Sequence, residues 1–310
     1  MRVLAIGEGM AEFRTTGPGG GWAQGYGGDV LNTAIHMARF GHRVQFASAL
    51  GTDAFSLQLR AAWQAQGLDL SLLASDAERQ CGIYFIHLDA RGERSFTYWR
   101  RDSAARHMLE LIDASALSAA ADEADLVYLS MITLAILSAT DRVRLADLVT
   151  QARRAGALFA FDTNYRPALW DGIEDARHWH ALFAGLADIA LPTLEDEVAL
   201  GHGAEPAEIL AAWRALGCTQ VALKLGAEGA MLPNGMIVAP ERAIAPVDTS
   251  GAGDAFNAAY LSARLNGGDA LESAREGNRL AGRVIEETGA IPALSKEAYA
   301  PWAIAGRADG

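Results

Sequence analysis

Short apolar runs alternate with longer amphipathic stretches along this 310-residue chain. Near-continuous apolar runs are typical of strands covered on both faces, and amphipathic stretches between them are typical of crossover helices. The alternation therefore predicts an α/β fold built on a parallel sheet. The predicted strands are Val3–Gly7, Val44–Leu50, Leu126–Ser130, Leu158–Asp162, Asp188–Pro192 and Val221–Leu225. The predicted helices are Asp29–Phe40, Phe55–Gln66, Thr140–Ala155, Ala207–Leu216, Ala252–Asn266 and Asp269–Glu287.

Two segments interrupt this alternation. Cys81–Leu88 and Arg94–Arg100 read as strands on either side of a turn at Asp89–Glu93, and the glycine-rich segment Gly17–Gly28 has no helical pattern. An ordinary hairpin at the sheet edge would account for the first of them. The aromatic and arginine residues gathered there favour a small β-sheet lid over a binding site. The lid is expected to comprise about residues 10–25 and 80–101.

Charge and composition limit the classes of molecule that this chain is expected to bind. The 38 acidic residues outnumber the 26 basic ones and give a net charge of −12, which disfavours nucleic-acid binding. An anionic substrate would therefore need clustered arginines. The longest apolar stretch, Leu126–Ala139, is shorter than the roughly 20 residues of a membrane-spanning helix, so we expect no membrane association. Cys81 and Cys218 have no metal-ligand spacing, and we expect free thiols in the cytoplasm.

The string Asp248-Thr249-Ser250-Gly251-Ala252-Gly253-Asp254-Ala255-Phe256 carries the clearest chemistry. Gly251, Ala252 and Gly253 lie where the chain enters a predicted helix, and the free amides of a helix start bind anions. Asp254 falls in the first turn beside that anion site. A phosphate cradle next to a carboxylate suits phosphoryl transfer, in which the carboxylate accepts the proton of the attacking hydroxyl. The alternative is that Asp254 is a helix-start acid favoured by the dipole.

This string resembles the C-terminal signature of the ribokinase/PfkB family of sugar kinases. The N-terminal signature of that family is matched by Gly27-Gly28-Asp29-Val30-Leu31-Asn32-Thr33-Ala34. Asp29 and Asn32 share one face of the helix start, although Asp29 could serve only as a helix cap. The resemblance covers essentially the whole chain. It implies a ribokinase-like three-layer α/β/α sandwich with a β-sheet lid, in a single domain of residues 1–310.

Two further segments, Gly92–Arg100 and Phe161–Trp170, are similar to the branch of the family that acts on keto-deoxy sugar acids. This similarity implies ATP-dependent phosphorylation of 2-dehydro-3-deoxy-D-gluconate at its 6-hydroxyl. Independently, a sugar acid needs a cation at its carboxylate, and arginine offers a planar fork for it. Arg100 lies on the expected lid, and Arg166 follows the strand Leu158–Asp162 at its carboxyl end, where open α/β sheets bind ligands.

The resemblance also assigns the remaining site residues. The sugar acid is expected to contact Gly28, Asn32, Tyr84, Tyr98, Arg100, Arg166 and Asp254. ATP is expected to contact Asn164, Lys224, Gly226, Gly229, Gly251, Gly253 and Asn278. Mg²⁺ is expected near Asp162 and Asp196. The family usually carries Asn-x-x-Glu at this last place, whereas this chain has Thr193 and Asp196, and Glu195 and Glu197 could compensate.

The exposed edges and aromatic residues of a lid sheet favour a homodimer or higher homo-oligomer joined through the lids. A kinase of a neutral sugar such as fructose or ribose is the alternative within the fold. A non-catalytic sugar or nucleotide sensor is the alternative of another class, which the intact Gly251–Asp254 string disfavours. A nicotinamide dehydrogenase is disfavoured because Gly7–Glu12 lacks the third glycine of the dinucleotide motif.

Overall fold

The structure, a computed structural model, describes residues 1–16, 20–88 and 94–302. Within this part of the chain, seven strands form a central sheet in the order β11-β10-β9-β8-β1-β4-β5, and every pairing is parallel. The strands are β1 (Arg2–Ile6), β4 (Arg43–Gly51), β5 (Leu73–Asp76), β8 (Leu126–Ser130), β9 (Leu158–Asp162), β10 (Ile189–Ala190) and β11 (Gln220–Val221). The predicted parallel sheet is confirmed.

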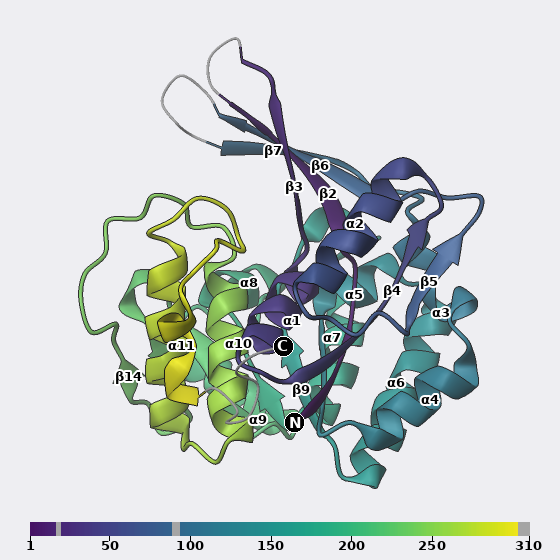
Figure 1. Cartoon of the computed structure of the whole chain (residues 1–310). Helices are drawn as coiled ribbons and strands as arrows, with labels where there is room; N and C mark the ends of the chain where they lie inside the picture. The colour runs from purple at the N-terminus through teal and green to yellow at the C-terminus, as the bar shows by residue number, and fades with distance from the viewer. Residues whose placement is uncertain (17–19, 89–93, 303–310) are drawn as a thin grey trace.

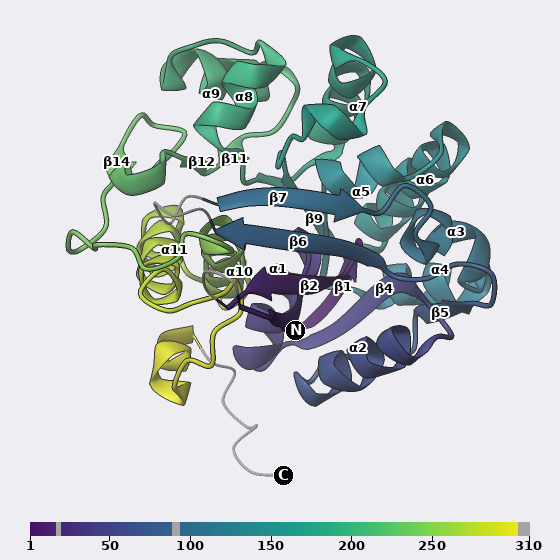
Figure 2. The same cartoon turned by 90° about the horizontal axis from the view of Figure 1, so that it is seen from above.

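Helices cover both faces of this sheet, as the view from above shows (Figure 2). One face packs against α1 (Asp29–Arg39), α2 (Ala54–Ala65), α10 (Ala252–Leu265) and α11 (Ala270–Val284). The other face packs against α3 (Met108–Leu111), α4 (Ala114–Glu123), α5 (Met131–Ile136), α6 (Ala139–Ala155), α7 (Ile173–Leu186) and α9 (Pro206–Ala215), and α8 (Leu194–Leu200) lies beside them. Alternate residues of β1 divide between the two cores: Val3 and Ala5 face α1, while Leu4 and Ile6 face the opposite layer.

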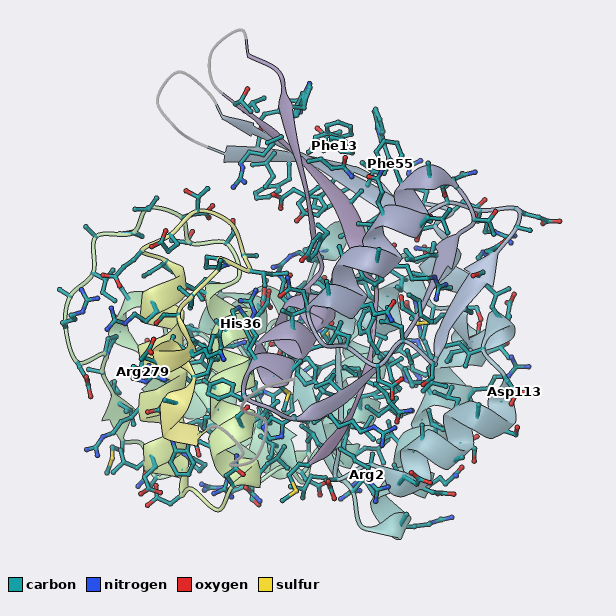
Figure 3. The ribbon with its side chains drawn as sticks, in the orientation of Figure 1. Arg2, Phe13, His36, Phe55, Asp113 and Arg279 are labelled. Atoms are coloured by element: carbon teal, nitrogen blue, oxygen red, sulfur yellow. The ribbon has the colours of Figure 1, made fainter. Side chains whose placement is uncertain are left out.

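The two segments that interrupt the alternation form a separate four-stranded sheet. Its order is β3-β2-β6-β7, from β2 (Met10–Thr15), β3 (Trp22–Gly27), β6 (Gly82–Leu88) and β7 (Arg94–Trp99). The expected turn at Asp89–Glu93 lies outside the described residues. Figure 1 shows this sheet rising from the body above α1 and α2. It is anchored there by aromatic packing, since Phe13 of β2 meets Phe55 of α2 edge to face with ring centroids 5.9 Å apart (Figure 3).

The prediction of a single strand over Val221–Leu225 is wrong. This segment divides at Ala222 between two sheets: β11 stays in the central sheet, and β12 (Leu223–Lys224) pairs with β13 (Ala230–Met231). Gly226 and Gly229 adopt positive φ angles of 58° and 96° between β12 and β13, which allows the chain to reverse there. β14 (Ile237–Val238) completes this small antiparallel sheet.

The helices α5 and α8 are absent from the predicted elements because their sequences carry no clear amphipathic period. Every residue of α5 is buried, so its apolar residues show no stripe. α8 is short and carries three acidic residues in its first turn. Across the described residues, no helix has the length and apolar character needed to cross a bilayer.

Candidate active site

Asp254 lies at the start of α10, at the carboxyl edge of the central sheet. The helix begins after Gly251, whose φ of 72° turns the chain into it. The buried carboxylate of Asp254 accepts a hydrogen bond from Asn32 Nδ2 at 2.8 Å, and the hydroxyl of Thr33 donates to its main-chain oxygen at 3.2 Å. Asn32 and Asp254 are 222 positions apart in the sequence. The two signature segments of the sequence therefore meet in one site.

The environment of Asp254 raises its pKa to about 8. Burial is the largest cause, and the nearby carboxylates of Asp29 and Asp162 add to it. The hydrogen bond from Asn32 and the charge of Lys224 act in the opposite direction. A carboxyl group whose pKa lies near neutral pH is suited to accept a proton during catalysis. A mere helix-start acid would have its pKa lowered by the helix dipole.

Lys224 occupies the other side of the same glycine turn. Its ammonium group donates to Asp162 Oδ1 and to Asn257 Oδ1, each at 3.0 Å, and Asn257 Nδ2 donates to Asp162 Oδ2 at 2.9 Å. A Cβ placed on Gly253 would lie 3.7 Å from Lys224 Nζ. The lysine, the helix start and Asp162 thus form one buried polar cluster. Sequence reasoning missed Asn257, although it lies one helical turn after Asp254 and so shares its face of α10.

Gly251 offers a test of this turn. An alanine there would hold an unfavourable φ of 72° and place its Cβ 2.6 Å from the carbonyl oxygen of Ala290. We expect Gly251→Ala to lower kcat by about 100-fold, because the amides at the helix start would be displaced. Gly267→Ala is the matched control, because Gly267 has a φ of 91° but open space around it. Both melting temperatures should fall, that of Gly251→Ala further, and equal kcat losses would contradict a specific role for the turn.

The two arginines expected at the sugar carboxylate have different surroundings. Arg100, just after β7, is 7% exposed and forms an ion pair with the buried carboxylate of Glu8. Ser103 Oγ donates to Glu8 Oε1 at 2.5 Å. Arg166 is half-exposed and contacts Asp196 Oδ1 at 3.2 Å. Both guanidinium groups oppose the increase in the pKa of Tyr98 that burial causes, so the two positive charges act on the same region.

Tyr84 and Tyr98 share one face of the lid sheet, opposite to the face that carries Phe13, and Tyr84 lies toward Asn32. Their rings stack with centroids 6.0 Å apart, and the hydroxyl of Tyr84 donates to Glu12 Oε2 at 2.5 Å. Asn32 Oδ1 is buried and has no hydrogen-bond partner in the described part of the chain. Because a buried unpaired acceptor is costly, this oxygen is suited to a substrate hydroxyl. Gly28 is required nearby, since a Cβ there would lie 2.2 Å from the carbonyl oxygen of Glu8.

The residues assigned to ATP fall into two groups. Gly226 and Gly229 lie just after β12. Asn278 of α11 packs next to Gly229, and its Nδ2 donates to Val238 O at 2.6 Å. Asn164 lies elsewhere: it follows β9, has a φ of 23°, and donates from Nδ2 to Asp29 Oδ2 at 3.1 Å. The structure therefore brings Asn164 next to the helix that carries Asn32.

Of the acidic residues at 195–197, Asp196 faces the site. Its pKa is raised to about 6, and burial is the largest cause. The charge of Asp162 also raises this pKa, whereas the charges of Arg166 and Lys224 lower it. The possibility that Glu197 compensates for the missing glutamate is wrong, because its carboxylate is fully buried and accepts hydrogen bonds from Thr163 Oγ1 and His202 Nδ1. Glu195 Oε1 lies about 4 Å from a Cβ placed on Gly226, on the side of the glycine turn.

Comparison with known proteins relates this geometry to a family. Residues 3–297 match the model of the pfkB family carbohydrate kinase. The chain is 39% identical over 301 residues to the 2-dehydro-3-deoxygluconokinase of Dickeya dadantii (strain 3937), covering 93% of this chain and 96% of the relative. It is 38% identical over 299 residues to the protein of the same name from Haemophilus influenzae, covering 94% and 95%. The crystal structure of a PfkB protein from Polaromonas sp. JS666 is 31% identical, with a TM-score of 0.81 and coverage of 94% and 97%.

Proposed function

This chain belongs to the pfkB family of carbohydrate kinases, and on that premise we propose that it phosphorylates 2-dehydro-3-deoxy-D-gluconate at its 6-hydroxyl with ATP. The observation that carries the proposal is the identity of 38–39% over nearly the full length to relatives named 2-dehydro-3-deoxygluconokinase. The geometry of the site supports the same function. Arg100 and Arg166 lie near Tyr98 of the lid, and Asp254, the proposed base, lies at the start of α10 and is hydrogen-bonded to Asn32. Phosphorus NMR of the product tests the proposal: a phosphate monoester on C6 supports it, and an ester at another carbon contradicts it.

Asp254 would act as the general base. The 6-hydroxyl oxygen attacks the γ-phosphorus, the bond from that phosphorus to the β–γ bridging oxygen breaks, ADP leaves, and the hydroxyl proton passes to Asp254. The main-chain amides at the start of α10 and the ammonium group of Lys224 would hold the charge on the transferred group. Asn32 orients the Asp254 carboxylate through the 2.8 Å hydrogen bond, and its free Oδ1 would accept from the sugar.

The carboxylates of Asp162 and Asp196 fit a magnesium ion. Oxygen ligands suit Mg²⁺, which is usually held by one or two carboxylates together with substrate phosphates and water. Burial raises the pKa of Asp196, and the charge of Asp162 adds to that increase, which supports a shared cation site for the two carboxylates. A bound Mg²⁺ would supply charge neutralisation at the phosphate oxygens. Asp162 is held in position by Lys224 and Asn257.

The pH dependence tests the base directly. Because the pKa of Asp254 is raised to about 8 and a base must be ionised, kcat/KM measured at low concentrations of both substrates should rise with pH and reach half of its plateau near pH 8. In Asn32→Leu the midpoint should move to higher pH, because the hydrogen bond that favours the carboxylate is lost. A midpoint that does not move in this variant would contradict the assignment.

The lid sheet supports two further parts of the proposal. We propose that residues 1–310 act as one kinase domain in which the lid, about residues 10–25 and 80–101, closes over the sugar and excludes water. The exposed aromatic residues Trp22, Phe96 and Trp99 of the lid support a homodimer joined through this sheet.

We also propose that the protein acts in the cytoplasm, because the reaction consumes ATP and both cysteines are buried free thiols.

A further inference from the structure

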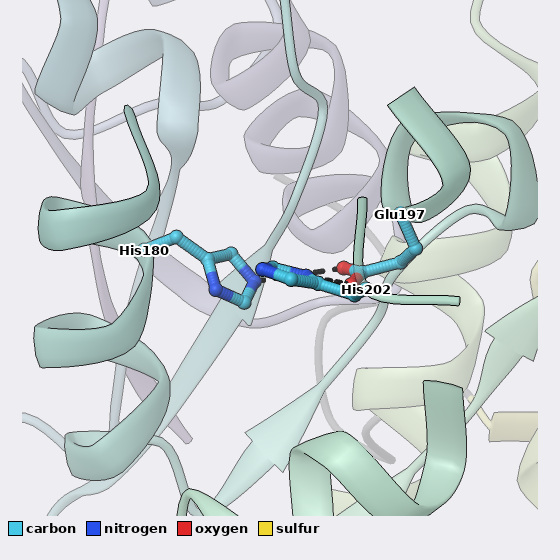
Figure 4. Close-up of side chains that lie close together, drawn as sticks. All are labelled: His180, Glu197 and His202. Atoms are coloured by element: carbon cyan, nitrogen blue, oxygen red, sulfur yellow. Dashed lines mark hydrogen bonds and ion pairs between the residues drawn. The ribbon is translucent and has the colours of Figure 1, made fainter. Parts of the chain in front are cut away.

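Three side chains with metal-binding atoms meet behind β9, away from Asp254. His180 comes from α7, Glu197 from α8, and His202 from the turn that follows α8 (Figure 4). Their candidate ligand atoms all lie within 4.8 Å of one another. His180 and Glu197 are fully buried, and the side chain of His202 is 19% exposed. Two separate helices and a loop therefore converge on one small polar cluster.

The hydrogen bonds of this cluster leave His180 unsatisfied. Glu197 accepts from Thr163 Oγ1 at 2.6 Å through Oε1 and pairs with His202 Nδ1 at 2.7 Å through Oε2. Neither ring nitrogen of His180 has a hydrogen-bond partner in the described part of the chain, and His180 Nε2 lies 3.5 Å from Glu197 Oε1. The ring of His180 packs edge to face against Trp213, so its surroundings are apolar. His180 therefore has an ion-pair contact with Glu197 but no hydrogen bond within the described residues, which leaves a buried nitrogen lone pair for another group to use.

We propose that His180, Glu197 and His202 form a binding site for a divalent transition-metal ion of the zinc class. Two imidazole nitrogens and one carboxylate are a common ligand set of Zn²⁺, with a water molecule in the fourth position. In such a tetrahedron, neighbouring ligand atoms are separated by roughly 3.3 Å. The separation of 3.5 Å between His180 Nε2 and Glu197 Oε1 is close to this value. His202 Nδ1 lies 2.7 Å from the other oxygen, Oε2, so the carboxylate and the His202 ring would have to turn for both nitrogens to share a metal with one oxygen.

The ligand types also suit a transition-metal cation. The nitrogen ligands distinguish this site from the oxygen-lined place at Asp162 and Asp196, since Mg²⁺ prefers oxygen whereas imidazole suits zinc, copper and nickel.

The metal would tie α7 to α8 and hold the segment beside the phosphate-binding side. Thr163, which donates to Glu197, stands between Asp162 and Asn164 in the sequence. None of the three ligands is assigned to the sugar or to ATP, so the metal would stabilise the fold and position Thr163 without touching the reacting atoms. Its binding should raise the melting temperature by a few degrees once the free metal exceeds its dissociation constant about 100-fold.

The test uses the full chain, stripped of metal with a chelator and then titrated with Co²⁺ and with Zn²⁺ in excess Mg²⁺. We expect one equivalent of Co²⁺ to give the visible absorption of a tetrahedral site, and one equivalent of Zn²⁺ to displace it. His202→Gln should weaken binding at least about 100-fold, because the amide keeps the hydrogen bond to Glu197 but is a poor metal ligand. The matched control is His178→Gln, which removes an exposed imidazole from the same helix α7 and should bind as the wild type does.

Three results would overturn the proposal: no tetrahedral cobalt spectrum in the wild type, equal affinity in wild type and His202→Gln, or a loss of binding in His178→Gln as large as that in His202→Gln. If His202→Gln does not fold, X-ray absorption of the zinc-loaded wild type decides. Two imidazole ligands on zinc support the site, and a ligand shell of oxygens alone rules it out.

Discussion

Asp254→Asn should lower kcat by about 10³-fold while leaving ATP binding within a factor of two, because general-base catalysis contributes on the order of 10² to 10⁴. Asparagine fills the same space and can still accept the hydrogen bond from Asn32 Nδ2, so the helix start keeps its geometry. What is lost is the group that takes the proton from the attacking hydroxyl. Steady-state kinetics with saturating ATP, together with calorimetric titration of ATP, separate the two effects. A variant that retains near-normal turnover would remove Asp254 from the base role.

Stability provides a control with a definite sign for the same variant. The pKa of Asp254 is raised from 3.8 to about 8 in the folded protein, mainly by burial. The wild type therefore loses stability as the pH rises from about 4 through about 8, because the buried carboxyl resists ionisation. Asp254→Asn has no such group. Its melting temperature should match that of the wild type near pH 4 and exceed it near pH 8, and a constant difference across this range would contradict the raised pKa.

Arg166→Leu should raise the KM for the sugar acid by about 10- to 100-fold and change the KM for ATP little, because a hydrogen bond to a charged group contributes about 1.5–3 kcal/mol. Arg166 is the more accessible of the two arginines, since its side chain is half-exposed although it contacts Asp196, whereas Arg100 is buried against Glu8. Its planar fork suits a carboxylate. The measurement is initial rates across both substrate concentrations.

Two controls distinguish carboxylate binding from a general loss of charge. Arg101→Leu removes an exposed arginine next to Arg100 and should leave the KM for the sugar acid unchanged. Arg166→Lys keeps the charge but not the fork, so it should recover only part of the affinity. If Arg166→Leu has an unchanged KM for the sugar acid, or a KM for ATP that rises as much, then Arg166 acts on Asp196 and not on the substrate carboxylate.

The sequence predicts those parts of the fold in which the local pattern of apolar residues indicates that a strand or helix is buried. The runs Leu126–Ser130 and Leu158–Asp162 match β8 and β9 because strands covered on both faces are apolar throughout. The division at Ala222 between two sheets is not predictable from sequence, because Val221 and Leu223 on either side of it are both buried and apolar, and only pairing with β10 or β13 distinguishes them.

Prediction of the site residues from sequence has the same limit, because contacts between distant segments leave no local pattern. Asp254 and Asn32 were found because each lies in a recognisable string, and the structure brings the two strings together. The partner of Arg100 was not found, because Glu8 lies far from it in sequence and only the packing of the lid on the body joins them. The expectation for Glu197 is wrong for a related reason: its position in an acidic run does not indicate which side of α8 faces His180 and His202.

The most direct test of the central claim is ATP consumption with Mg²⁺ across a small panel of acceptors: 2-dehydro-3-deoxygluconate, its galactonate epimer, gluconate, fructose and ribose. The account predicts turnover confined to the keto-deoxy sugar acids, because the hydroxyl must reach Asp254 while the carboxylate meets the arginines. Turnover with fructose or ribose in their place would contradict the substrate assignment and the roles of Arg100 and Arg166. No turnover with any acceptor, together with tight ATP binding, would contradict the catalytic claim itself and favour a sensor.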